Sequence, residues 1–105
     1  MDKIKEDRLV SAGWQVGETA EFLELTAEET AFVELKLALA DYLRKIRAGR
    51  GWTQSEVARQ LHSSQSRVAK MEAADVSVSL DLLVKSLLTL GASRHDVGRV
   101  IAQAA

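Results

Sequence analysis

The sequence predicts an all-α protein in which five helices, the first of them long, follow an N-terminal extension. Apolar residues recur at three- and four-residue spacing over most of the chain, and a serine or threonine precedes each of the five periodic segments as a helix cap. No segment outside the N-terminal part alternates apolar and polar residues over a strand's length, and there is no proline. We therefore divide the chain into residues 1–26, an arm with a short helix, and residues 27–105, the helical domain, which together make one compact domain.

The composition limits the classes of protein to consider. With 105 residues, 47% of them hydrophobic, the chain has the size of one domain and can bury a modest core. The lack of cysteine excludes disulfides and thiolate zinc sites. Charges within the first twenty positions exclude a signal-peptide core, and no apolar stretch approaches the roughly 18 residues of a membrane span. We expect a soluble, cytoplasmic protein without membrane contact.

The first 25 residues are the least periodic part of the chain. Residues 1–13 mix polar and apolar side chains and end in a glycine, which predicts a mobile arm. A group of apolar anchors follows, with one short helix expected over about residues 19–25. These anchors are Trp14, Val16, Phe22, Leu23 and Leu25.

A long helix is predicted over residues 27–49. Its start is a capping box, in which the Thr26 hydroxyl accepts the Glu29 N–H and the Glu29 carboxylate accepts the Thr26 N–H. Two apolar stripes follow, so more than one side of this helix is expected to be covered. Gly49 and Gly51 end it, since glycine adopts the left-handed conformation without steric cost. The stripes are Phe32, Leu35, Leu39, Tyr42, Leu43 and Ile46, and Val33, Leu37 and Ala40.

Four shorter helices follow, each behind a hydroxyl cap. The first covers residues 54–61, and Glu56 stands three positions after its cap as a second capping box. The next covers about residues 64–73, and the one after it ends at Gly91. In chain order, the caps are Thr53, Ser63 or Ser64, Ser79 and Ser93.

The pattern of residues 53–72 carries most of the functional information. Four apolar positions suit two short helices packed together, and the small Ala58 fits where these helices cross. Only polar residues, from His62 to Ser66, lie between them. The outer face of the second helix would carry side chains that can reach base edges and phosphates in a DNA major groove. The inner side chains are Val57, Leu61, Val68 and Met71; the outer ones are Gln65, Ser66, Arg67 and Lys70.

The charges are segregated along the chain in a way that fits this pattern. The formal net charge is only −1. Residues 1–41 hold ten acidic and four basic side chains, whereas residues 42–105 hold five acidic and ten basic. The two parts therefore carry net charges of −6 and +5, and the basic part contains the pattern of residues 53–72. Runs of charge are often only solvated surface, but the positive charge of residues 42–105 favours a nucleic-acid partner for that part of the chain.

The segment from Leu43 to about Val97 resembles the Xre/lambda-repressor family of helix-turn-helix proteins. This resemblance implies a five-helix lambda-repressor-like DNA-binding domain. The positions that carry it are Arg47, Gly51, Thr53-Gln54, Ala58, Leu61, Gln65, Val68, Met71-Glu72 and the SLDLL sequence that begins at Ser79.

Three departures from the family pattern stand out. His62 replaces the usual glycine of the turn, and must take up a left-handed or similar conformation at a small cost. Residues 73–75 replace the glycine that often follows the recognition helix. Residues 76–79 also lack the basic side chains of many relatives, so phosphate contact would rest on hydroxyls and backbone amides at the start of the helix that Ser79 caps.

The resemblance implies a role for each polar position of the motif. Gln54 lies at a helix N-terminus that favours a phosphate, and its side chain can brace Gln65. Gln65 suits N6 and N7 of adenine, and Arg67 suits a guanine or a phosphate. Lys70 is expected to contact a phosphate. The full set of expected DNA-binding residues is Thr53, Gln54, Ser64, Gln65, Ser66, Arg67, Lys70 and Ser79.

The resemblance also implies an ion pair between Arg47 and Glu72. Such a pair would tie the first long helix to the end of the recognition helix and would orient that helix more than stabilise the fold. The alternative is that both are ordinary surface charges.

Catalytic, metal and cofactor sites are not expected. His62 lies among serines, but no acidic residue is placed to orient it as a triad would require. His62 and His95 are the only histidines, and no ligand-spaced cluster surrounds either. The serines are better explained as caps and as a polar surface. We therefore expect no enzyme activity.

Two partner proteins remain open besides double-stranded DNA. The leucines near residues 80–90 exceed what one core stripe needs, which favours a homodimer and hence a palindromic operator. The N-terminal forty residues resemble, more loosely, the extension of HigA-type antitoxins, which implies a small basic toxin as partner. The alternative explanation for the same residues is an extra helix that packs on the bundle or completes the dimer. The leading interpretation is a DNA-binding regulator that represses its own operon; the alternative is a protein-interaction module that mainly inhibits a partner enzyme.

Overall fold

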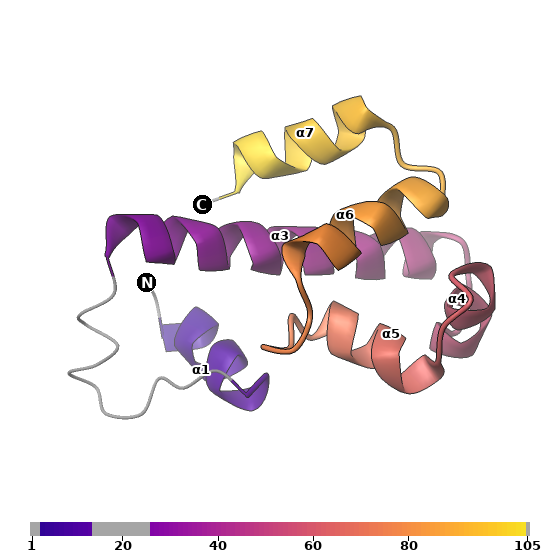
Figure 1. Cartoon of the computed structure of the whole chain (residues 1–105), viewed down its shortest axis with the longest axis horizontal. Helices are drawn as coiled ribbons and strands as arrows, with labels where there is room; N and C mark the ends of the chain where they lie inside the picture. The colour runs from indigo at the N-terminus through magenta and orange to yellow at the C-terminus, as the bar shows by residue number, and fades with distance from the viewer. Residues whose placement is uncertain (1–2, 14–25, 105) are drawn as a thin grey trace.

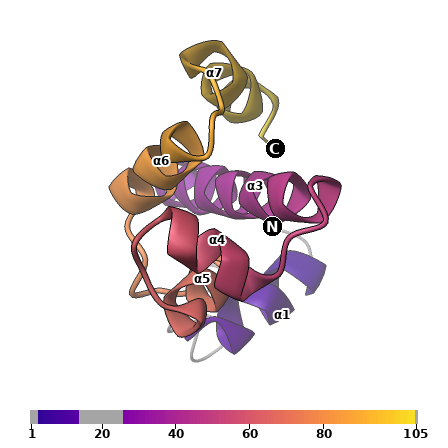
Figure 2. The same cartoon turned by 90° about the vertical axis from the view of Figure 1, so that its right-hand side faces the viewer.

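A computed structural model of the chain describes residues 3–13 and 26–104. These residues form α1 (Lys3–Ser11), α3 (Ala27–Gly49), α4 (Gln54–Gln60), α5 (Gln65–Glu72), α6 (Leu80–Thr89) and α7 (Arg94–Gln103). No strand occurs in the part described, so the predicted all-α fold is confirmed. Figures 1 and 2 show α3 as a central rod, with α7 on one side of it and α1 and α5 on the other. No helix among these residues is long and apolar enough to cross a lipid bilayer.

The long helix α3 begins and ends where its sequence signals lie. Glu29 N donates to the Thr26 hydroxyl at 3.1 Å, and Thr26 N donates to the Glu29 carboxylate at 3.4 Å, so both halves of the capping box are present. At the other end, Gly51 has φ +68° and directs the chain away from the helix axis. The 23-residue helix between them contacts α5, α6 and α7 and provides the scaffold for the rest of the fold.

The core lies around α3 and takes up side chains from both apolar stripes of that helix, whereas Phe32 at the start of the first stripe is 46% exposed. Leu39 and Leu43 from the first stripe are fully buried. Val33, Leu37 and Ala40 from the second stripe are also buried, which agrees with the expectation that more than one side is covered. The shorter helices contribute further buried side chains, among them Val57, Val68, Met71, Leu83 and Leu87.

The N-terminal residues differ from the expected mobile arm. Residues Lys3–Ser11 form α1, which buries Leu9 and is fastened to α3 by ion pairs between Lys5 and Glu34 and between Arg8 and Asp41. The spacing of apolar residues could not predict this helix because its attachment is largely electrostatic and joins residues far apart in the sequence. The expected short helix at about residues 19–25 and the apolar anchors from Trp14 to Leu25 lie outside the described residues.

Four helices end in the same hydrogen-bonded turn, although only two of the four turns contain glycine. In each, one residue has positive φ, and the next N–H bonds back to a carbonyl five residues earlier, as in a Schellman motif. Gly51 and Gly91 hold this position after α3 and α6. His62, with φ +52°, holds it after α4, which agrees with the left-handed conformation expected for it. Ala74, with φ +55°, holds it after α5 and is buried.

These turns predict opposite effects for two matched substitutions. We expect His62→Gly to raise the free energy of unfolding by about 0.5–1 kcal/mol, because glycine relieves left-handed strain at an exposed site. Gly51→Ala should lower it by about 1 kcal/mol through strain alone, since no atom lies within 4 Å of the added methyl group. Urea denaturation of both variants measures the difference. A Gly51→Ala protein as stable as the parent would contradict the role assigned to backbone strain.

Candidate nucleic-acid interface

Two short helices, α4 and α5, pack against each other and expose one polar face. Their contact is made by buried side chains from both helices, including Val57, Ala58 and Val68, and the small Ala58 allows close approach. A tight turn through His62 and Ser63 joins them. Ser64, not Ser63, caps α5, because its hydroxyl accepts the N–H of residue 67 at 3.1 Å.

The ion pair expected between Arg47 and Glu72 is present. Arg47 Nε donates to Glu72 Oε2 at 2.6 Å, and Arg47 Nη2 donates to Glu72 Oε1 at 3.0 Å. The Glu72 side chain is only 5% exposed, and that of Arg47 is 22% exposed. The hydrogen bond with Glu72 raises the pKa of Arg47 above its usual range. Such a bidentate pair fixes both the distance and the angle between α3 and the end of α5.

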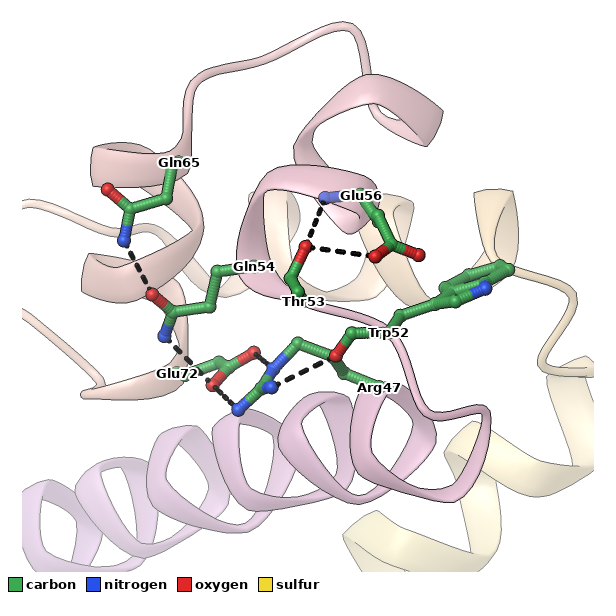
Figure 3. A network of polar contacts seen from close by, with 7 residues as sticks. All are labelled: Arg47, Trp52, Thr53, Gln54, Glu56, Gln65 and Glu72. Atoms are coloured by element: carbon green, nitrogen blue, oxygen red, sulfur yellow. Dashed lines mark hydrogen bonds and ion pairs between the residues drawn. The ribbon is translucent and has the colours of Figure 1, made fainter.

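Polar side chains extend this pair into a network that reaches both ends of α5 (Figure 3). Arg47 Nη1 also donates to the Trp52 carbonyl at 3.2 Å, just before α4 begins. Gln54 Nε2 donates to Glu72 Oε1 at 3.3 Å, and Gln54 Oε1 accepts from Gln65 Nε2 at 2.6 Å. The network therefore links the C-terminal end of α3, the N-terminal end of α4 and both ends of α5.

The residues expected to contact DNA fall into two groups in the structure. The first group lies exposed along α5 and can reach a partner: Gln65, Ser66, Arg67 and Lys70. The second group makes local bonds that shape the surface. Ser64 and Ser79 cap α5 and α6, the Thr53 hydroxyl bonds to Glu56, and Gln54 bridges Gln65 and Glu72.

A hollow of about 320 Å³ lies between the start of α5 and the start of α6. Two basic side chains, Arg67 and Lys70, and three hydroxyl groups face it. Its lining residues are Ser64, Ser66, Arg67, Lys70, Ser77, Val78 and Leu82. Cations and hydroxyls together suit a phosphate oxygen. Ser79 does not line this hollow.

Ser77 is the surface residue that sequence reasoning missed. Its N–H and its hydroxyl both donate to Asp75 Oδ1, at 2.9 and 2.7 Å. These bonds hold the pKa of Asp75 below its usual range, the hydroxyl bond having the larger effect and the N–H bond the next. The Asp-Val-Ser sequence could have indicated the turn, because an aspartate commonly accepts from the backbone two residues on.

Two packed helices joined by a tight turn, the second with an exposed polar face, define the helix-turn-helix class of DNA-binding domain. A family model described as a helix-turn-helix domain matches residues 38–100, more than half of the chain, and the protein belongs to this family. The match begins within α3, so α1 lies outside it. No curated protein and no solved structure matches the chain. Within the described residues, no group of three or more acidic, histidine or cysteine side chains is arranged to hold a metal ion.

The buried carboxylate of Glu72 gives a direct test of the network. We expect Glu72→Gln to lower the free energy of unfolding by about 1–3 kcal/mol, because the half-buried guanidinium of Arg47 loses its counter-charge while the shape is kept. Glu56→Gln is the matched control and should change stability by less than about 0.5 kcal/mol, since it lies at the surface end of the network. Urea denaturation compares the two variants. Equal losses would show that Glu72 has no special role.

Proposed function

We propose that the protein is a sequence-specific transcriptional regulator that places α5 in the major groove of DNA. The observation that carries this proposal is the exposed polar row of α5 on a helix whose orientation is fixed by the buried Glu72 carboxylate. Direct readout of bases requires side chains held within about 0.5 Å of a productive position, which a rigid support provides. The net charge of +5 on residues 42–105 supports an anionic partner.

Gln65 is proposed to read an adenine. A glutamine amide has two N–H donors and an acceptor oxygen. Gln54 takes one of the donors, so the second donor and the oxygen of Gln65 remain for N7 and N6 of adenine. The brace from Gln54 therefore fixes the side chain without consuming its capacity to read a base.

Arg67 and Lys70 are proposed to contact phosphates of the DNA backbone, and Arg67 could instead contact a guanine. Both line the hollow beside the start of α6 together with Ser64, Ser66 and Ser77. A phosphate there would meet two positive charges and the hydroxyl donors of Ser64 and Ser66, while the Ser77 hydroxyl donates to Asp75. Contacts of this kind set the register of the protein on DNA and provide affinity without sequence preference.

Two substitutions separate base reading from phosphate contact. Gln65→Ala should relax preference at one base pair, where the parent protein discriminates by about 1–3 kcal/mol. Lys70→Ala should weaken binding to all sequences alike and make it less dependent on salt. Binding to an operator and to a set with single base changes, measured at two salt concentrations, distinguishes the two effects. Unchanged sequence preference in Gln65→Ala would rule out its assignment.

We further propose that the protein represses its own operon in the cytoplasm by covering the promoter. A steric block of this kind needs neither catalysis nor a cofactor. Retardation of DNA from the region upstream of its own gene tests the proposal. Failure to bind that DNA at moderate salt would favour the alternative, a protein-interaction module that inhibits a partner enzyme.

A homodimer is proposed as the DNA-binding form. Leu88 on α6 and Ile101 on α7 are 42% and 38% exposed, and α7 lies on the outside of the bundle (Figures 1 and 2). Exposed apolar side chains on neighbouring helices support a contact between two copies. Two recognition helices about 34 Å apart would then read a palindromic operator.

The dimer proposal predicts how charged substitutions change the mass in solution. Leu88→Lys combined with Ile101→Glu should give the monomer mass by light scattering and weaken operator binding at least about tenfold, because one recognition helix then binds alone. Val10→Lys is the control, since Val10 is 58% exposed but lies on α1. A parent protein that is monomeric while saturating its DNA would exclude the dimer.

An additional role as antitoxin is supported by the charge of the first part of the chain. Residues 1–41 carry a net charge of −6, which suits a small basic toxin. Glu34 and Asp41 pair with Lys5 and Arg8 of α1, whose positive charges are already counted in this net value. A short basic open reading frame beside the gene would favour the antitoxin role. An unrelated neighbour, with DNA binding intact, would favour a stand-alone regulator.

A further inference from the structure

Helix α1 touches the segment that follows the recognition helix. The N–H of Val76 donates to the carbonyl of Ala12 at 3.0 Å, which joins the end of α1 to the chain just after α5. A methyl group added to Gly13 would lie 3.3 Å from Val76 Cγ1, so the two segments are in close contact. Figures 1 and 2 both show α1 beside α5.

Apolar burial and two ion pairs hold α1 in this place within the described residues. Leu9 is the buried apolar residue of α1, and Ala12, just after the helix, is also buried. The Arg8 guanidinium makes two hydrogen bonds to the Asp41 carboxylate of α3, at 2.8 and 3.2 Å. Lys5 pairs with Glu34, which lies about two helical turns before Asp41 on the same helix. The helix therefore forms a bridge, with ion pairs to α3 on one side and a backbone bond to residue 76 on the other.

The segment it contacts, residues 73–79, is here named the exit segment. It contains Ala74, a non-glycine residue with φ +55°, which is a conformation that alanine resists. It also supplies Ser77 to the hollow that contains Arg67 and Lys70. A segment with local strain and a functional surface needs support from its surroundings.

Support for the exit segment comes from α3 as well as from α1. Lys36 of α3 is buried, and its burial lowers the pKa of its ammonium group, while the negative charge of Asp75 opposes that shift. Asp75 of the exit segment and Lys36 of α3 therefore attract each other. The bond from Val76 to Ala12 holds the next residue from the side of α1.

We propose that α1 is a positioning element of the DNA-binding surface and that Arg8 is a positioning residue within it. By pairing with Asp41, Arg8 keeps the Ala12 carbonyl where it accepts the Val76 N–H. The exit segment is then held so that Ser77 faces the same hollow as Arg67 and Lys70. The inference rests on the proposed DNA-binding function, and it assigns a role to residues outside the helix-turn-helix match.

The test compares Arg8→Ala with Arg44→Ala. Arg44 is a matched control because it carries the same charge and its Nη2 lies 3.9 Å from Asp41 Oδ1, but it belongs to α3. Amide hydrogen exchange of Val76 is measured by NMR without DNA. The Ser63 amide, which closes the turn after α4 and lies outside the exit segment, is the internal reference. Operator affinity and thermal unfolding are measured on the same proteins.

Arg8→Ala should speed exchange at Val76 about fivefold, as expected for the loss of a half-exposed ion pair, and leave Ser63 unchanged. Operator affinity should fall about three- to fivefold at a temperature where the protein stays folded. Arg44→Ala should change neither quantity beyond a uniform charge effect. Arg8→Lys keeps the ion pair but not both hydrogen bonds of the guanidinium. Its Val76 exchange rate and operator affinity should lie between those of the parent and of Arg8→Ala.

Three outcomes would overturn the proposal. Val76 exchange that is the same in Arg8→Ala and in the parent would show that the pair does not hold the exit segment. Faster exchange with unchanged affinity, or equal loss of affinity in Arg8→Ala and Arg44→Ala, would remove its role in positioning. A parent protein that binds no DNA would instead defeat the proposed function, and the two failures are distinguishable because exchange is measured without DNA.

Discussion

The buried carboxylate of Glu72 is the constraint on which the rest of the DNA-binding surface depends. A charge that is 95% removed from solvent must be compensated by nearby donors, and three N–H groups from Arg47 and Gln54 supply this compensation. These donors come from α3 and α4, so the requirement can be met only when both helices hold one arrangement relative to α5. Hydrophobic packing of core residues such as Val57 and Val68 provides most of the cohesion but leaves small rotations nearly equal in energy. The ion pair removes that freedom and thereby aims the polar face of α5.

Helix ends explain most of what the sequence allowed us to predict. Hydroxyl caps and left-handed turns act within a few residues, so Thr26, Ser64 and Gly51 could be interpreted without knowledge of the tertiary structure. The bounds of α3 follow from two such signals. His62 shows that a local rule can hold even where the preferred glycine is absent, because the helix before it and the cap after it require the turn. The pairing of Arg47 with Glu72, 25 residues apart, was accessible only through resemblance to a family.

Interactions between distant, individually ordinary residues could not be predicted. Arg8 and Asp41 each look like surface charges in the sequence, and nothing in their local pattern indicates that they meet. The same holds for the backbone bond between Ala12 and Val76, which involves no distinctive side chain. The place of Ser77 in the hollow was missed for a related reason. The sequence indicates its turn, but its position beside Lys70 depends on how α6 packs relative to α5.

The recognition helix is supported differently at its two ends, and this difference has a functional consequence. At its start, Ser64 caps the helix and Gln54 braces Gln65, so the support lies within the helix-turn-helix motif itself. At its end, Arg47 of α3 holds Glu72. The chain then continues through Ala74, which has a strained positive φ, and bonds to the residue that follows α1. Under the proposed function, base reading at the start of α5 would rest on the motif itself, whereas contact with the DNA backbone near residues 75–79 would depend on an element outside it. We therefore expect a change in the N-terminal part of the chain to alter how strongly the protein binds DNA and to leave unchanged which bases it reads.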